Sequence, residues 1–125
     1  HDKQDLFVAL VEQRRARIAQ QLGAALTAPG GIEARLAVNA RLIDSFASDF
    51  DNGFPLSAIE SNIIKLTVTN NAAAVVEDAL SLTSNHGLSR TNPLERHYRD
   101  VLCGRVHTPQ DDSTRVAAGR FALGV

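Results

Sequence analysis

The sequence contains no methionine, no tryptophan and one cysteine among its 125 residues. A single cysteine, Cys103, excludes an internal disulfide bond and fits a reducing compartment, so we expect a cytoplasmic protein. We expect Cys103 to be a small buried residue at the end of a helix rather than a reactive thiol. Because methionine is absent and the chain begins at His1, we also expect it to be part of a longer protein.

Other signals are missing as well. No apolar run approaches the length of about 20 residues that a membrane-spanning helix needs, so no membrane partner is expected. The formal net charge is −1 and the basic residues are spread along the chain, so no nucleic-acid footprint is present. The sequence has no Glu-x-x-His pair, no glycine-rich phosphate loop and no nucleophile elbow, and its four histidines lack metal-ligand spacing. We therefore predict no metal site.

What the sequence does contain is apolar residues at helical spacing along most of its length. This pattern predicts an all-α, up-and-down helical bundle of the four-helix type, in one domain that covers residues 1–125. The first two helices should pair as an antiparallel hairpin. A Ser57/Glu60 capping box marks the start of the third helix. The expected helices are Gln4–Leu26, Ile32–Phe50, Ala58–Ser84, a helix that begins at Pro93 and ends at Gly104, and Ser113–Leu123.

The third helix carries apolar residues on two faces, so it should be central in the bundle. Its run from Thr67 to Asn71 is polar for such a position. The side chains of Thr69, Asn70 and Asn71 either line a crevice or, as we favour, make hydrogen bonds between helices.

The most polar and specific stretch runs from Asn85 to Asp112. Within it, Asn92 is a suitable N-cap, Pro93 fits the first helical position, and a carboxylate follows in the first turn. Two oppositely charged pairs at i,i+4 spacing, Glu95 with Arg99 and Arg96 with Asp100, support this helix. The loop that follows holds His107 and Pro109, and Asp111 or Asp112 should cap the last helix.

The residues of this stretch resemble the C-terminal helical domain of the acyl-CoA dehydrogenase superfamily. The resemblance covers roughly Ala72 to Leu123 and rests on the PLERHYRD helix, the preceding Gly87-Leu88 turn and the following loop. It implies a C-terminal domain of a larger, tetrameric flavoenzyme whose N-terminal and sheet domains hold most of the flavin. It also implies a structural role for Arg99, which should brace a neighbouring helix or loop.

One departure from the family pattern bears on the reaction. The family's dehydrogenases use a loop glutamate as the base that removes a proton from an acyl thioester, and Thr108 occupies that position here. His107 is instead similar to the loop histidine of the flavin-dependent monooxygenase branch, which includes dibenzothiophene and hydroxyphenylacetate hydroxylase-type enzymes. The resemblance thus implies reduced flavin delivered by a separate reductase. His107 would be catalytic, as a hydrogen-bond donor and proton exchanger beside the flavin. The competing interpretation is a histidine that braces its loop.

The cofactor is expected to be FAD or FMN. In the dehydrogenases a glutamine, a Gly-Gly pair and the residues after the glutamate approach the adenosine half of FAD. Side chains replace bare backbone at several of these places, which makes FMN, without an adenosine half, plausible. Two alternatives remain open: an FAD-dependent acyl-CoA dehydrogenase and a non-catalytic helical assembly domain. The predicted cofactor-binding residues are Ser81, Ser84, Asn85, Gly87, Gln110 and Asp112.

Overall fold

The computed structural model describes residues 30–125 and, before them, residues 5, 9, 12–13, 16–17 and 20. These residues contain helices and no strand, which confirms the all-α prediction. The predicted first helix, Gln4–Leu26, and its pairing with the second lie almost entirely outside the described residues. The described elements are α2 (Ile32–Asp51), α3 (Ala58–Thr83), the 3-10 turn η1 (Ser84–His86), α4 (Pro93–Val106) and α5 (Asp111–Leu123).

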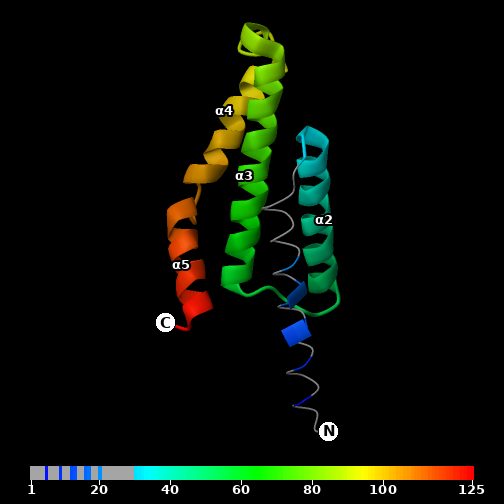
Figure 1. Ribbon diagram of the computed structural model, residues 1–125, viewed down its shortest axis with the longest axis vertical. Coiled ribbons are helices and arrows are strands. Elements are labelled where there is room, and N and C mark those ends of the chain that lie inside the picture. The colour runs from blue at the N-terminus through cyan, green and yellow to red at the C-terminus, as the bar shows by residue number, and fades with distance from the viewer. Residues whose placement is uncertain (1–4, 6–8, 10–11, 14–15, 18–19, 21–29) are drawn as a thin grey trace.

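Helix α3 is the centre of this arrangement, as its two apolar faces predict. It packs against α2 on one side and against both α4 and α5 on the other (Figure 1). The chain runs down α2, up α3, and then down through α4 and α5, which follow one another along the same side of α3 (Figure 1). The positions of α2, α4 and α5 are therefore set by their contacts with α3.

The α2–α3 contact contains the main apolar core. The side chains of Val38, Leu42 and Phe46 are buried there, and the partly buried residues Leu56, Ile63, Ile64 and Val68 pack against them. The capping box forms as predicted, because the Ser57 hydroxyl accepts from the Glu60 amide and the Glu60 carboxylate accepts from the Ser57 amide. This pair fixes where α3 begins.

The polar run in α3 makes hydrogen bonds between helices. The Asn71 amide donates to Oδ1 of Asn39 at 3.0 Å, and the Asn39 amide donates to the Val68 carbonyl oxygen at 3.1 Å. Asn39 is buried, so these bonds satisfy polar atoms that would otherwise destabilise the α2–α3 interface. Asn70 bonds in the same way to α5, through the carboxylate of Asp111. The interhelical interpretation is confirmed for Asn70 and Asn71, whereas the Thr69 hydroxyl donates to the Lys65 carbonyl oxygen within α3.

Two helix boundaries differ from prediction by two residues, and the ends of α2 and α3 differ by one. Helix α4 continues past Gly104 to Val106, and Gly104 lacks the positive φ of a helix-ending glycine. A Cβ at Gly104 would lie 3.0 Å from Cγ2 of Thr69, so its small size serves the close approach of α4 to α3. Helix α5 begins at Asp111, with Gln110 as its N-cap and without a side-chain cap. The prediction that Asp111 or Asp112 caps this helix is wrong, because both residues lie within its first turn. The Asp111 carboxylate instead accepts from Asn70.

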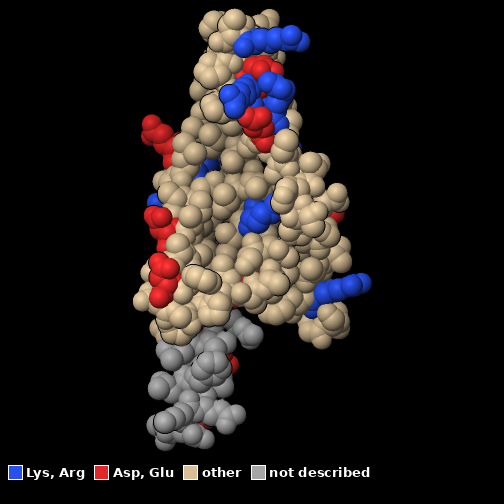
Figure 2. Space-filling model, turned by 180° about the vertical axis from the view of Figure 1, so that it is seen from behind, with Lys and Arg blue, Asp and Glu red and all other residues tan. Residues whose placement is uncertain are grey.

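The expected burial of Cys103 is also wrong, since its side chain is exposed and its Sγ donates to the Arg99 carbonyl oxygen. On the face opposite to that of Figure 1, charged side chains gather at the upper end, where α3 passes into α4 (Figure 2). The middle of that face is largely uncharged and is hollowed (Figure 2).

Candidate functional site

The candidate site is the junction loop, residues 107–110, which joins the end of α4 to the start of α5. His107 is the C-cap of α4 and Gln110 is the N-cap of α5, so the loop's two ends are fixed by the helices they terminate. The Thr108–Pro109 peptide bond is cis. The loop lies beside α3, and side chains of α3 hold it there.

Lys65 of α3 holds the junction loop directly. Its ammonium nitrogen donates to the carbonyl oxygen of His107 at 3.0 Å and to that of Pro109 at 2.8 Å. A cation at this place is favourable because the last carbonyl groups of α4 carry partial negative charge. The sequence interpretation did not single out Lys65. Its one signal was a charge within the apolar segment of a helix expected to be central.

Asp111, at the first position of α5, is the second anchor. Asn70 of α3 donates to its Oδ2 at 3.0 Å, and the Lys65 ammonium lies 3.9 Å from its Oδ1. Its side chain is only 12% exposed, and the positive end of the α5 dipole also stabilises the carboxylate. Asp111 therefore docks α5 on α3 and is not presented to a ligand.

His107 is exposed, and its ring is partly fixed by its own loop. Its Nδ1 lies 3.0 Å from the carbonyl oxygen of Thr108. Since a carbonyl oxygen can only accept, this hydrogen bond requires a proton on Nδ1. Nε2 is then the ring nitrogen open to a ligand: an acceptor when the ring is neutral and a donor when it is protonated. The structure thus contains the loop-bracing bond and also an exposed imidazole.

The other predicted cofactor residues lie mainly at the end of α3. Ser81 and Asn85 are exposed, and so is Ser84, whose backbone has a positive φ of 50°. The Ser81 hydroxyl donates to the Glu77 carbonyl within α3. Gly87 is buried, and a Cβ there would lie 2.2 Å from Oγ1 of Thr83, so the turn after η1 needs glycine in order to fold back onto α3. Gly87 thus has a packing role.

The structure does not bring the predicted residues into one pocket. His107, Gln110 and Asp112 lie at one end of α4, and the residues from Ser81 to Gly87 lie at the other (Figure 1). The 14 residues of α4 separate the two groups by roughly 20 Å at the usual helical rise of about 1.5 Å per residue. If both groups bind a cofactor, they must contact parts of it, or cofactor molecules, that lie far apart.

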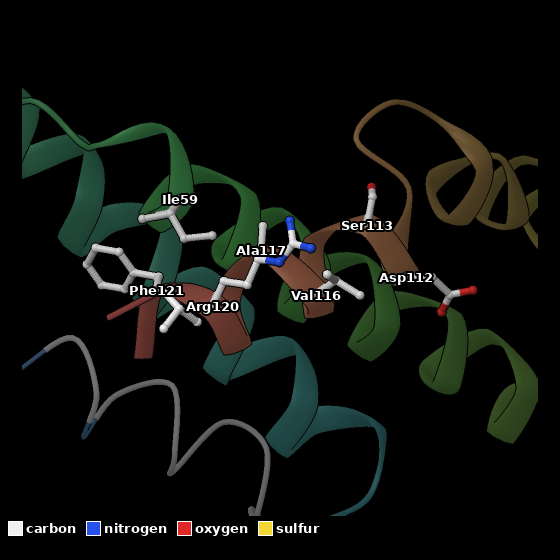
Figure 3. A pocket seen from close by; sticks show the side chains of 8 residues that line it. Ile59, Asp112, Ser113, Val116, Ala117, Arg120 and Phe121 are labelled. Carbon is white, nitrogen blue, oxygen red and sulfur yellow. The ribbon is translucent and has the colours of Figure 1, made fainter. Parts of the chain in front are cut away.

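An open groove of about 760 Å³ lies along α5, next to the junction loop. Asp112 and Ser113 are at one end of the groove, and Ile59 of α3 lies close to Phe121 at the other (Figure 3). Asp112 is therefore a groove residue, 98% exposed and paired with Arg115 at 3.2 Å. A second groove, between the start of α2 and the end of α3, is lined in part by Ser81. His107 lines neither of these two grooves.

The charged residues of α4 have local roles. Glu95 and Arg99 pair at 2.7 Å, and Arg96 and Asp100 pair at 3.5 Å, as the i,i+4 spacing predicts. The hydrogen bond to Glu95, helped by its negative charge, raises the pKa of Arg99. Arg99 is thus engaged within its own helix, and the expected bracing of a neighbouring helix or loop is wrong. Asn92 caps α4 as predicted, accepting from the Leu94 amide at 3.0 Å.

The described residues contain neither a metal-binding cluster nor a helix that could span a membrane. None of their His, Cys, Asp and Glu side chains gather in groups of three or more that could hold a metal ion. Among the helices that the structure describes, none is both long enough and apolar enough to cross a membrane.

With the fold and the junction loop defined, comparison with known proteins identifies the family. Residues 6–115 match the family described as "Acyl-CoA dehydrogenase, C-terminal domain". Since this match covers most of the chain, the chain belongs to that family. The all-α arrangement around α3 agrees with this assignment.

One relative is the protein named "Putative acyl-CoA dehydrogenase YdbM" of Bacillus subtilis (strain 168). It is 42% identical over 64 residues, which are 50% of this chain and 17% of the relative. The matched segment thus spans only a small part of the length of that relative. No solved structure matches the chain.

Proposed function

We propose that this chain is the C-terminal helical domain of a flavin-dependent oxidoreductase that works as a two-component monooxygenase. In such a reaction, reduced flavin and oxygen are consumed, one oxygen atom enters the substrate, and the other leaves as water. The flavin would be held largely by N-terminal and sheet domains of the same protein, and a separate reductase would supply it in reduced form. The intact enzyme would be a tetramer.

One observation carries the proposal: the ionisable side chain that the junction loop exposes is an imidazole. Thr108 cannot act as a base, and Asp111, the first carboxylate after it, is engaged by Asn70 and Lys65. The junction loop therefore offers no free carboxylate to remove a proton from an acyl thioester. An imidazole suits a different task, because it can donate a hydrogen bond and exchange a proton near neutral pH.

The chain's own contribution follows from the geometry of His107. With Nδ1 bonded to the Thr108 carbonyl, the ring accepts or releases a proton at Nε2, the exposed nitrogen. When protonated there, it donates a hydrogen bond toward negative charge that develops on a neighbouring group. Bound reduced flavin supplies the electrons for activating oxygen. Covering the loop by the missing domains would keep bulk water from the site.

The exposed polar groups on the domain fit contacts with a flavin. Gln110 and Asp112 are exposed beside His107, and Ser84 and Asn85 are exposed at the far end of α4. Because roughly 20 Å of helix separates these groups, we propose that the second group contacts the flavin of a neighbouring subunit. Side chains at these positions favour FMN over FAD, whose adenosine half needs close backbone approach.

A second candidate is an FAD-dependent acyl-CoA dehydrogenase, and two observations favour it. The relative from Bacillus subtilis is named "Putative acyl-CoA dehydrogenase YdbM", and Asp112 places an exposed carboxylate four residues after Thr108. A third possibility is a helical domain that only supports assembly. These three functions differ in what they do with flavin, so one set of measurements separates them.

We expect the full-length protein that carries this domain to bind reduced FMN or FAD and to consume oxygen before hydrogen peroxide is released. Rapid mixing with oxygenated buffer would follow both quantities, and free reduced FMN, which releases peroxide without delay, is the control. Peroxide release as fast as oxygen uptake, together with reduction of the bound flavin by acyl-CoA thioesters, would establish the dehydrogenase instead. Failure to bind either flavin would leave the assembly function.

A further inference from the structure

We propose that Lys65 is a positioning residue for His107: it orients the junction loop and thereby determines which ring nitrogen of His107 carries the proton. The part of this proposal that concerns the reaction rests on the proposed function. The part that concerns the imidazole stands on the structure of the chain itself. The two parts can be tested separately.

The carbonyl groups of the junction loop are divided between two partners. Those of His107 and Pro109 accept from the Lys65 ammonium, at 3.0 Å and 2.8 Å. The carbonyl between them, that of Thr108, accepts from Nδ1 of His107 at 3.0 Å. By holding the carbonyls on either side, Lys65 fixes the peptide plane that presents the Thr108 oxygen to the imidazole. Lys65 thus orients the imidazole indirectly, through the backbone of Thr108.

Lys65 is well placed to hold the loop firmly. Its side chain is 23% exposed, and its hydrogen bond to the Pro109 carbonyl is partly buried and so partly shielded from competing water. Thr69, four residues further along α3, packs closely against Gly104 of α4. Asn70, the next residue, donates a hydrogen bond to Asp111 of α5. One face of α3 therefore fixes the end of α4, the loop and the start of α5 together. The lysine supplies the central contact of the three.

The consequence for His107 is a defined tautomer. With the proton on Nδ1, the neutral ring presents an acceptor at Nε2, and a protonated ring presents a donor at the same atom. A bound group then exchanges a proton with Nε2 only, and the orientation of that nitrogen is fixed. If the loop were free to rotate, the Thr108 carbonyl would leave Nδ1 and the ring would populate both tautomers.

We expect ring ¹⁵N chemical shifts of His107, measured by NMR on the 125-residue chain without flavin, to show the Nδ1-protonated tautomer. In Lys65→Met the ratio of Nδ1–H to Nε2–H should fall about fivefold to tenfold, the size expected for the net effect of one hydrogen bond. Lys65→Arg, which keeps a cationic donor, should restore most of the ratio. Arg41→Met is the control, since it removes one exposed positive charge from α2 and should leave the ratio unchanged.

Lys65→Met also removes a cation beside Asp111, whose buried Oδ1 has no hydrogen-bond partner. If that variant does not fold, as judged by circular dichroism, the pair Lys65→Met/Asp111→Asn can be compared with Asp111→Asn alone. A predominantly Nε2-protonated ring in the unmodified chain, or a ratio that no Lys65 variant changes, would overturn the proposal.

In the full-length enzyme, Lys65→Met should shorten the delay between oxygen uptake and peroxide release by roughly 10-fold to 100-fold, as misplacement of a reacting group does. A changed tautomer ratio in an enzyme that never shows such a delay would support the role of Lys65 and refute the monooxygenase. An unchanged tautomer ratio in an enzyme with a normal delay would refute the role of Lys65 and support the monooxygenase.

Discussion

In the full-length enzyme, His107→Ala is expected to shorten the delay between oxygen uptake and peroxide release by about 100-fold or more. The reason is that a positioned acid or base typically contributes a factor of about 10²–10⁴, and the proposed function assigns that role to His107, the exposed ionisable residue of the junction loop. Oxygen uptake itself should continue, because the flavin remains reducible. Rapid mixing with an oxygen sensor and a peroxidase-coupled peroxide assay measures both.

His97→Ala is the matched control for this prediction. His97 is an exposed histidine on α4, the helix that ends at His107, and its removal changes the same atoms at a different place. The delay should be unaffected in His97→Ala. Equal delays in the two variants and in the unmodified enzyme would exclude His107 from the reaction.

The second prediction concerns the core that positions α3. Phe46→Ala should lower the free energy of unfolding by about 3–5 kcal/mol, because it removes a large buried ring and leaves a cavity. Phe46 is 5% exposed and packs with Val38 and Leu42 between α2 and α3. A loss of that size is a large part of the total stability of about 5–15 kcal/mol that such domains have. Urea unfolding followed by circular dichroism would measure it.

Phe50→Ala makes the same chemical change one turn further along α2, where the ring is 65% exposed. Its cost should stay below about 1 kcal/mol, since little buried area is lost. If the two variants were destabilised equally, the α2–α3 core would not be the one described here.

Local sequence signals predicted much of the fold. Ser57 with Glu60, and Asn92 alone, accept hydrogen bonds from free amide groups at helix starts, and Pro93 has no amide hydrogen that needs a partner. All these contacts act within four residues of chain. Such signals do not depend on what the helix later contacts. The start of α3 and the start of α4 therefore agree with prediction, and so does the central place of α3.

The errors arose where contacts between helices override local preference. Gly104 has the residue type of a helix end, but its small size is needed for contact with Thr69. Asp111 has the residue type of an N-cap, but Asn70 of α3 takes its carboxylate. Neither partner can be identified from the neighbouring sequence, because each lies some 35 to 41 residues away along the chain.

The candidate site was also predictable only in part, because some of its contacts join residues that are distant in the sequence. The family resemblance implied an imidazole in the junction loop in place of a carboxylate, and the structure places that imidazole at the surface. The contribution of Lys65 was not predictable, since its partners are backbone carbonyls that any residue possesses. The residues from Ser81 to Gly87 were predicted as cofactor contacts from the family resemblance alone. The proposed cofactor contacts of this segment would involve other domains or subunits, so the structure of this chain does not test them.

The most direct test of the central claim is a crystal structure of the full-length protein with bound FMN or FAD. We expect the junction loop to face the isoalloxazine, with Nε2 of His107 within about 2.6–3.2 Å of a flavin atom or joined to it through one water molecule. A structure in which His107 faces bulk solvent, with the isoalloxazine bound elsewhere, would contradict it.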